Sequence, residues 1–285
     1  MLESYKMKYV IVVEPYRENS GGIAVLHTLG KKLKEKGCEV YIISPHGPGR
    51  TLPELDLIDR SYFDTINEDS WVIYPEIRVG NPLNAKNVIR WVLNTPGFIG
   101  GSTNTWSDTD LVYTIGDYWH IDPKIKVEGY LKVWDFKLDF WKDMGFNRDL
   151  NLHLIRKASG RRGSRNINFD KHENSSIQID GNIANNFTIL KEFLNKTNKF
   201  ISYDTGTFYS CIAALCGATS IVIPDGVHTK EEYRNKFPLC KYGVAWGLDD
   251  IQWAIDTKHK VRENLLDMEK ESDELVDSFI KRTQK

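Results

Sequence analysis

The chain has 285 residues and a formal net charge of −1, with 41% hydrophobic and 27% charged residues. This length is enough for one large domain or two modest ones, each with its own hydrophobic core. Because the net charge is close to zero, the whole molecule has no electrostatic attraction to nucleic acid or to an anionic membrane surface, although a local basic cluster could still bind a small anion.

The first elements follow a strand–helix–strand pattern. Residues 8–13 are a short apolar run typical of a strand buried on both faces. A polar loop with two glycines follows over residues 18–22. Apolar residues then recur at helical spacing across residues 23–33, and Gly37 lies where the C-terminal cap of that helix is expected. With a strand over residues 39–44, this unit predicts a parallel sheet.

The first half continues with a predicted strand over residues 71–74, a helix over residues 85–93 and a strand over residues 111–115. Residues 94–101 contain one proline and three glycines, which cannot continue a helix and therefore predict a loop. A second series starts with a strand at residues 152–155, followed by a short strand over 177–179 and a helix over 186–194.

The clearest unit of the chain is a strand over residues 200–203, a turn over 204–206, a helix over 207–216 and a strand over 220–224. The helix carries small and apolar residues nearly all round, so we expect it to be buried. Two further helices are predicted over residues 248–256 and 259–282, the second one amphipathic and strongly charged.

This order of elements predicts two α/β domains, over residues 1–145 and 146–260. The helix within residues 261–285 either returns to the first domain or stays on its own. Residues 1–9 lack an apolar signal core, and no apolar run approaches the roughly 20 residues that span a bilayer. The spacing of the four cysteines fits neither a CxxC pair nor a dense disulfide framework, so we expect a soluble, cytoplasmic protein. They are Cys38, Cys211, Cys216 and Cys240.

Three stretches carry a family resemblance. The first is Asn19-Ser20-Gly21-Gly22-Ile23-Ala24, which leads into the first helix. The second is Leu154-Ile155-Arg156-Lys157-Ala158 together with Arg161 and Arg162. The third runs from Ser202-Tyr203-Asp204-Thr205 through Ala213-Ala214-Leu215-Cys216-Gly217 to Val222-Ile223-Pro224. In this order they resemble the glycine loop, the basic pair and the donor-binding segment of the GT-B glycosyltransferases, most closely small polysaccharide-building transferases of bacteria and large algal viruses.

The resemblance implies an α/β fold of two Rossmann-like domains that face each other across a cleft, with a nucleotide sugar bound mostly to the C-terminal one. It implies a hexosyl- or pentosyltransferase that moves a sugar from a nucleotide-diphosphate donor to a hydroxyl of a glycan, without a metal or another cofactor. A UDP-sugar is favoured, with UDP-xylose as a candidate. Many retaining members carry two glutamates eight positions apart, where this chain has Asp204 and Ile212. The missing carboxylate puts a retaining reaction in doubt.

The candidate donor site begins with four cations within seven residues, after a predicted strand. Arginine is suited to bidentate phosphate contacts and lysine acts as a point charge, so this cluster could neutralise the leaving diphosphate. The alternative is a solvated basic loop. The four cations are Arg156, Lys157, Arg161 and Arg162.

The turn before the buried helix supplies the remaining donor candidates. A helix start offers unpaired N–H groups and a partial positive charge, threonine hydroxyls can add hydrogen-bond donors, and glycine lets a ligand approach the backbone. The alternatives are that Asp204 or Thr205 only caps the helix and that Tyr203 only packs in the core. The candidates are Tyr203, Asp204, Thr205, Gly206 and Thr207, with Gly21 and Gly22 contributing from the first half.

A reaction that inverts the anomeric centre needs a general base for the acceptor hydroxyl. Glu14, Glu76 and Asp117 each follow a predicted strand, and strand ends are where open α/β sheets place ligands. Each could instead be a solvated or capping carboxylate. Arg78 and Trp119 are candidates for the acceptor pocket, since aromatic faces are good platforms for sugar rings.

Other functions are weighed against this one. Asp108-Thr109-Asp110 matches the DxD pattern of metal-dependent GT-A transferases, but it precedes a strand instead of following one, so a turn is favoured and no metal site is predicted. The GxGxxG fingerprint of dehydrogenases is absent. Another α/β nucleotide-using enzyme and a non-catalytic nucleotide- or sugar-binding module stay open. The predicted partners are a nucleotide sugar and a glycan, without nucleic acid.

Overall fold

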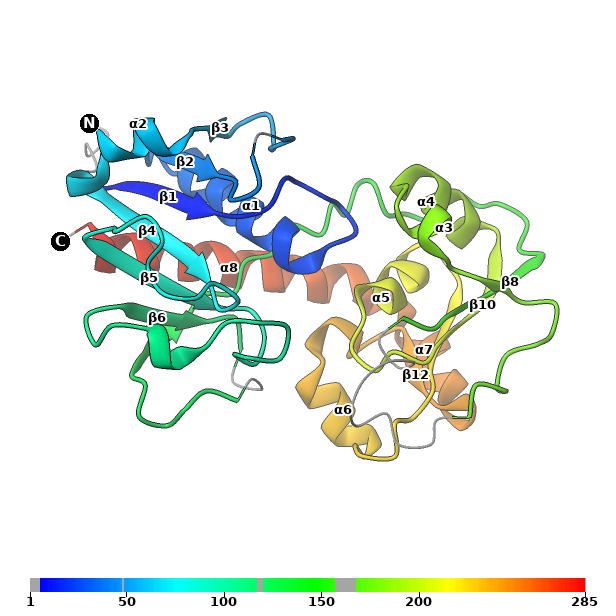
Figure 1. The fold of residues 1–285 in the computed structure, drawn as a ribbon. Coiled ribbons are helices and arrows are strands. Elements are labelled where there is room, and N and C mark those ends of the chain that lie inside the picture. Colours follow the sequence, from blue (N-terminus) through cyan, green and yellow to red (C-terminus); the bar gives the residue numbers. More distant parts are fainter. Residues whose placement is uncertain (1–5, 48, 117–119, 157–167, 285) are drawn as a thin grey trace. The chain divides into compact units, whose positions relative to one another are not determined.

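The computed structural model describes residues 6–47, 49–116, 120–156 and 168–284. The chain divides into two compact units. Unit 1 consists of Met1–Asp135 together with Met268–Lys285, and unit 2 consists of Phe136–Asp267. Each unit is built on a parallel β-sheet of its own (Figure 1).

Within the described residues of unit 1, seven strands pair in parallel in the order β3-β2-β1-β4-β5-β6-β7. The parallel sheet that the first strand–helix–strand unit predicted is therefore confirmed. The strands are β1 (Lys8–Val12), β2 (Val40–Ile43), β3 (Asp56–Leu57), β4 (Ser70–Pro75), β5 (Asn87–Val92), β6 (Leu111–Thr114) and β7 (Val127–Tyr130). The helices are α1 (Gly21–Glu35), α2 (Arg60–Asp64), η1 (Asn67–Asp69) and η2 (Thr103–Thr105).

Both faces of this sheet are covered. On one face, the apolar side of α1 packs with alternate residues of the central strands, and Val276, Phe279 and Ile280 of α8 (Val261–Thr283) join the same core. On the other face, Phe63 of α2 and Ile66 pack with the remaining strand residues. Because central parallel strands are buried on both sides, they read as continuous apolar runs.

The prediction of a helix over residues 85–93 is wrong, because this segment forms strand β5. Ile89 and Trp91 enter the core shared with α1 and α8, whereas Val88 enters the core on the opposite face. The run Val-Ile-Arg-Trp-Val is rich in β-branched and aromatic residues, which favour strands. Arg90 interrupts the apolar pattern and obscured that signal.

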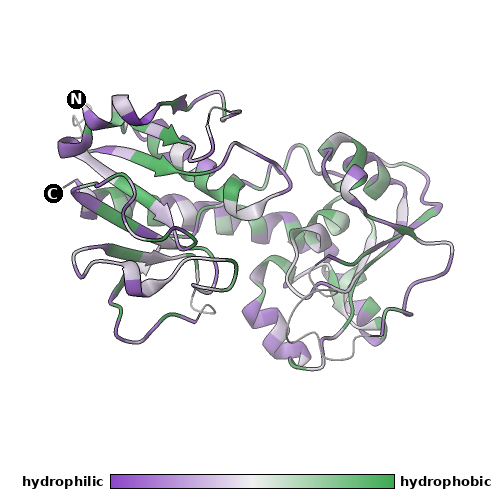
Figure 2. Cartoon of the chain, viewed as in Figure 1, coloured by the Kyte–Doolittle hydropathy of each residue, from purple (hydrophilic) through white to green (hydrophobic). Residues whose placement is uncertain are grey.

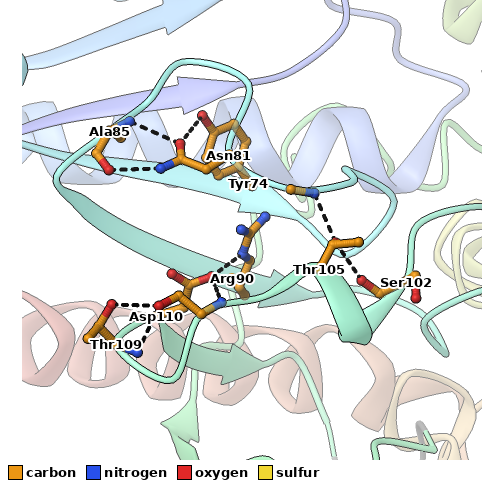
Figure 3. Close-up of polar contacts among 10 residues, drawn as sticks. Tyr74, Asn81, Ala85, Arg90, Ser102, Thr105, Thr109 and Asp110 are labelled. Atoms are coloured by element: carbon orange, nitrogen blue, oxygen red, sulfur yellow. Dashed lines mark hydrogen bonds and ion pairs between the residues drawn. The ribbon is translucent and has the colours of Figure 1, made fainter.

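Arg90 is 1% exposed, and its Nε donates a hydrogen bond to Asp110 Oδ2 over 2.7 Å (Figure 3). Its guanidinium also lies 5.0 Å from the centre of the Tyr74 ring. Asp110 belongs to the DxD pattern, and it further accepts the Ser107 amide over 3.2 Å. The carboxylate is thus used to fix the turn before β6, as the favoured interpretation of that pattern expected.

Within the described residues of unit 2, five strands pair in parallel in the order β12-β11-β10-β8-β9. They are β8 (Leu150–Leu154), β9 (Ile177–Gln178), β10 (Thr197–Ser202), β11 (Thr219–Val222) and β12 (Val244–Trp246). The helices are α3 (Gly181–Ala184), α4 (Phe187–Asn195), α5 (Phe208–Leu215), α6 (Lys230–Lys236), η3 (Pro238–Cys240), η4 (Leu248–Asp250), α7 (Ile251–Thr257), η5 (Lys258–Lys260) and the start of α8.

The predicted strand–helix–strand unit of residues 200–224 is confirmed as β10, α5 and β11. Helix α5 is buried along most of its length, as its composition predicted. Strand β12 and helix α6 were not predicted. Figure 2 shows why α6 is hard to recognise: its ribbon is largely hydrophilic, and of its residues only Tyr233 is fully buried. Among the described residues, no helix has both the length and the hydrophobicity needed to cross a membrane.

Candidate functional site

The strand order of each unit defines where a ligand is expected. In unit 2 the chain runs from β8 to β9 on one side and then continues with β10 on the other side of β8. In unit 1 it runs from β1 outward through β2 and β3, then continues with β4 on the other side of β1. Open α/β sheets bind ligands beyond the carboxyl ends of the strands at such switch points. The two switch points lie between β8 and β10 and between β1 and β4.

Two predicted donor residues meet at the switch point of unit 2. Arg156 follows β8, and its backbone amide donates a hydrogen bond to Asp204 Oδ1 over 3.2 Å. Asp204 follows β10 and is only 3% exposed. The Arg156 side chain is exposed at this edge, where its Nη1 donates to the Tyr209 hydroxyl over 3.2 Å and its guanidinium lies 5.4 Å from the centre of that ring. A cation is therefore held where a ligand is expected.

Thr205 lies beside them, half-buried, and its Oγ1 donates a hydrogen bond to Asp225 Oδ2 over 3.1 Å. The cap of α5 is Thr207, whose side chain accepts the Tyr209 amide over 3.4 Å, and neither Asp204 nor Thr205 takes that role. The Thr207 carbonyl also accepts the Ser210 amide over 3.2 Å. The positive end of the α5 dipole thus lies at the same edge as Arg156, which favours a bound anion.

Gly206 and Tyr203 have structural surroundings that the sequence did not reveal. A side-chain carbon at Gly206 would lie 2.6 Å from the ring of Phe237, so this glycine makes room for that ring. Tyr203 is fully buried. Its hydroxyl accepts the Lys171 amide over 2.8 Å and pairs with His172 Nδ1 over 2.8 Å, which ties residues 171–172 to the end of β10. For Tyr203 the core-packing alternative describes the observed position.

Glu14, His46 and Arg78 gather at the switch point of unit 1, after β1, β2 and β4. Glu14 Oε2 lies 2.7 Å from His46 Nδ1, and Glu14 Oε1 accepts a hydrogen bond from Arg78 Nη2 over 2.6 Å. Burial raises the pKa of Glu14, but the hydrogen bond and charge of His46 and those of Arg78 outweigh it, so this pKa lies below its ordinary value. Glu14 is therefore a carboxylate, and His46 Nδ1 must donate to it. The His46 side chain is 70% exposed, so its ring is accessible to a ligand at this edge.

Glu76, after β4, differs from Glu14. It is 3% exposed, and its Oε2 accepts the Leu93 amide over 3.0 Å. Burial raises the pKa of Glu76, while hydrogen bonds from backbone amides, including that of Leu93, oppose the shift. The carboxyl group fastens the loop after β5 to the loop after β4, where solvent hardly reaches it.

The glycine loop begins α1 directly. Ser20 precedes this helix, and its side chain makes no capping hydrogen bond to any described residue. A side-chain carbon at Gly21 would meet no described atom within 4 Å, and one at Gly22 would meet only Leu93 at 3.9 Å. The start of α1, after β1, is thus open to a ligand.

The structure does not describe every candidate residue. Asp117, Trp119, Lys157, Arg161 and Arg162 lie outside the described residues. Within the described ranges, no group of three or more histidine, cysteine, aspartate and glutamate residues could hold a metal ion.

His46 was not identified as a candidate in the sequence analysis. The signal that could have found it is its place two residues after a predicted strand of the same parallel sheet, which brings it to the edge where Glu14 lies.

Comparisons with known proteins add evidence on the fold. No family model matches the chain. A segment is 30% identical over 117 residues to Protein BZZ1 of Saccharomyces cerevisiae, and the match covers 40% of this chain but 18% of the length of that protein. So small a share of both chains identifies no family.

Solved structures match along nearly the whole chain. An alpha-glucosyltransferase in complex with UDP and a 13-mer DNA containing a HMU base aligns with a TM-score of 0.53 and 12% identity over 98% of both chains. An alpha-glucosyltransferase with UDP and a 13-mer DNA containing an A:G mismatch aligns with a TM-score of 0.50 and 12% identity over 95% of both. The two parallel sheets and these matches agree with the prediction from the sequence: the chain has the α/β fold of the GT-B glycosyltransferases.

Proposed function

We propose that the chain is a glycosyltransferase that moves a sugar from a nucleotide-diphosphate donor to a hydroxyl of a glycan. The observation that carries this proposal is the convergence of Arg156, Asp204 and Thr205 at the switch point of the unit 2 sheet, in a chain with the GT-B fold. UDP is the nucleotide in the two solved structures with this fold. We therefore propose a UDP-sugar as donor, with UDP-xylose as the pentose candidate beside UDP-hexoses.

Unit 2 is proposed to bind the donor. Cleavage of the bond between sugar and diphosphate places negative charge on the leaving phosphates, which must be stabilised. Arg156 offers a guanidinium that Tyr209 already holds in place, and the start of α5 adds the positive end of its dipole at the same edge. These groups, together with Lys157, Arg161 and Arg162, are proposed to stabilise that charge without a metal.

Unit 1 is proposed to bind the acceptor and to supply the base. Histidine is the commonest general base, and a carboxylate that accepts its Nδ1 proton fixes the tautomer whose Nε2 takes a proton. Glu14 pairs with His46 Nδ1 and orients the ring, so we propose His46 as the base of a reaction that inverts the anomeric centre, with Glu14 as its positioning residue. Arg78 keeps Glu14 ionised. Asp117 remains the other candidate base.

The acceptor is proposed to be a glycan. The two aligned structures contain DNA, but DNA recognition depends on neutralising phosphates with an excess of positive charge. This chain has a net charge of −1. The four cysteines are buried free thiols, which supports the proposal of a cytoplasmic enzyme.

The test is a transfer assay with purified protein and a panel of radiolabelled UDP-sugars, each with and without glycan acceptors or a DNA duplex. Labelled glycan together with released UDP would support the proposal, and NMR of the product anomer would separate inversion from retention. Labelled DNA would replace the glycan acceptor. Binding of UDP-sugars with neither transfer nor hydrolysis would instead support a non-catalytic binding module, and the proposed function would fail.

A further inference from the structure

The hydroxyl of Thr205 is committed within the protein. Thr205 follows β10 and Asp225 follows β11, and because these strands are parallel neighbours, their carboxyl-terminal loops adjoin. Thr205 Oγ1 donates its hydrogen bond to Asp225 Oδ2 over 3.1 Å. The polarity of this contact decides what the hydroxyl can offer to a ligand.

Asp225 can act only as an acceptor here. Its Oδ1 accepts the amides of Val227 and His228 over 2.9 and 3.0 Å. Its Oδ2 pairs with His228 Nδ1 over 2.8 Å. Burial raises the pKa of Asp225, but the hydrogen bonds from the His228 and Val227 amides and from the His228 ring outweigh it, and the pKa lies below its ordinary value. A carboxylate has no proton to give, so Thr205 must donate.

The proton on the far side of His228 is fixed as well. His228 Nε2 lies 3.1 Å from Lys236 Nζ, and an ammonium group is a donor without acceptor capacity. Nε2 therefore accepts from Lys236, and Nδ1 carries the ring proton and donates it to Asp225. The chain of contacts runs from Lys236 through His228 to Asp225, and every donor on either side of Asp225 points towards it.

We propose that Thr205 recognises a hydroxyl of the donor and does not bind its phosphates. With its own proton held by Asp225, Thr205 Oγ1 has only lone pairs left, and phosphate oxygens at neutral pH are likewise acceptors. A sugar hydroxyl can donate to it. For Thr205, this inference replaces the expectation that its hydroxyl donates to the diphosphate, and it leaves that role to Arg156 and the backbone amides. The inference rests on the proposed nucleotide-sugar function.

The hydroxyl could belong to the ribose or to the transferred sugar. Both present the same chemistry to Thr205, so calorimetric titrations with four probes are needed to separate them. The probes are pyrophosphate, UDP, UDP-glucose and 2′,3′-dideoxy-UDP, which lacks the ribose hydroxyls. The variants are Thr205→Val, which keeps the shape and loses the hydroxyl, and Thr205→Ser, which keeps the hydroxyl. Thr205→Ala provides a second loss of the group should the valine variant fail to fold.

The inference predicts that Thr205→Val leaves the affinity for pyrophosphate unchanged. If Thr205 recognises the ribose, Thr205→Val should lose affinity about tenfold for UDP but not for dideoxy-UDP. If Thr205 recognises the transferred sugar, the variant should lose affinity for UDP-glucose alone. In both cases Thr205→Ser should bind nearly as the wild type does. An equal loss for pyrophosphate would show a donor to phosphate and overturn the inference, and so would unchanged affinity for every probe. If the wild-type protein bound none of the probes, the proposed function would fail along with it, an outcome distinct from a bound but insensitive Thr205.

Discussion

Replacing Arg156 by alanine tests the donor site directly. The guanidinium is exposed at the carboxyl edge of unit 2, held over the Tyr209 ring at 5.4 Å and by a 3.2 Å hydrogen bond to its hydroxyl. A hydrogen bond to a charged group contributes about 1.5–3 kcal/mol. Because Tyr209 already orders the side chain, little of this is spent on fixing it. We therefore expect Arg156→Ala to lose at least about 1.5 kcal/mol of UDP binding, which is about a tenfold rise in Kd.

Isothermal titration calorimetry with UDP measures this loss, and two further variants sharpen it. Arg156→Lys keeps a charge but not the planar fork, so we expect an intermediate Kd. Lys196→Ala removes a cation that precedes β10, at the amino edge of the same sheet, where its ammonium group pairs with Glu192. We expect this control to bind UDP as the wild type does.

The stability of these variants should stay within about 0.5 kcal/mol of wild type, since both side chains lie on the surface. Thermal melts check that a change in affinity does not come from unfolding. If Arg156→Ala and Lys196→Ala bound UDP with the same Kd as the wild type, the assignment of Arg156 to the diphosphate would be refuted.

Three other predictions follow from the structure. His46→Ala should lower kcat by about 10²–10⁴-fold in an inverting reaction while calorimetry finds unchanged affinity for UDP, and an unchanged kcat would remove His46 from the mechanism. Arg90→Ala leaves a buried carboxylate without its partner and should cost about 3–5 kcal/mol of unfolding free energy in urea. Lys86→Ala breaks an exposed pair and should cost far less, and equal losses would contradict the burial argument. The pKa of Glu76 is raised in the folded state, so its contribution to the free energy of unfolding is fully present below the unfolded pKa and is lost as pH rises through the folded value. Thermal melts from pH 4 to 7 should therefore show the wild type losing stability relative to Glu76→Gln as pH increases. A constant or opposite difference would show that the pKa of Glu76 is not raised.

The fold could be predicted from the sequence wherever local pattern and tertiary role agree. β1, α1 and β2 repeat the apolar spacing that parallel sheets impose, and β10, α5 and β11 do the same in unit 2. β5 was predicted as a helix because Arg90 lies in a buried strand, where its charge is paired with Asp110, twenty positions away. A pairing over such a distance leaves no periodic signal.

The candidate site could be predicted in part, because strand ends can be found from the sequence. Arg156 and Asp204 were placed by this rule and meet through a hydrogen bond. The roles of single side chains depend on neighbours that only the fold supplies. Position 206 is a glycine because the Phe237 ring leaves no room for a side chain there. Thr205 was expected to donate a hydrogen bond to the ligand, but it donates its proton to Asp225.

Hydrogen–deuterium exchange of the 285-residue chain with and without UDP tests the central claim most directly. If the nucleotide diphosphate binds at the switch point of unit 2, peptides that cover residues 153–156 and 203–209 should be protected, while those at the amino edge of the same sheet, around residues 195–198, should exchange as before. UDP binding that protects the amino edge and leaves residues 153–156 and 203–209 unchanged would contradict the account.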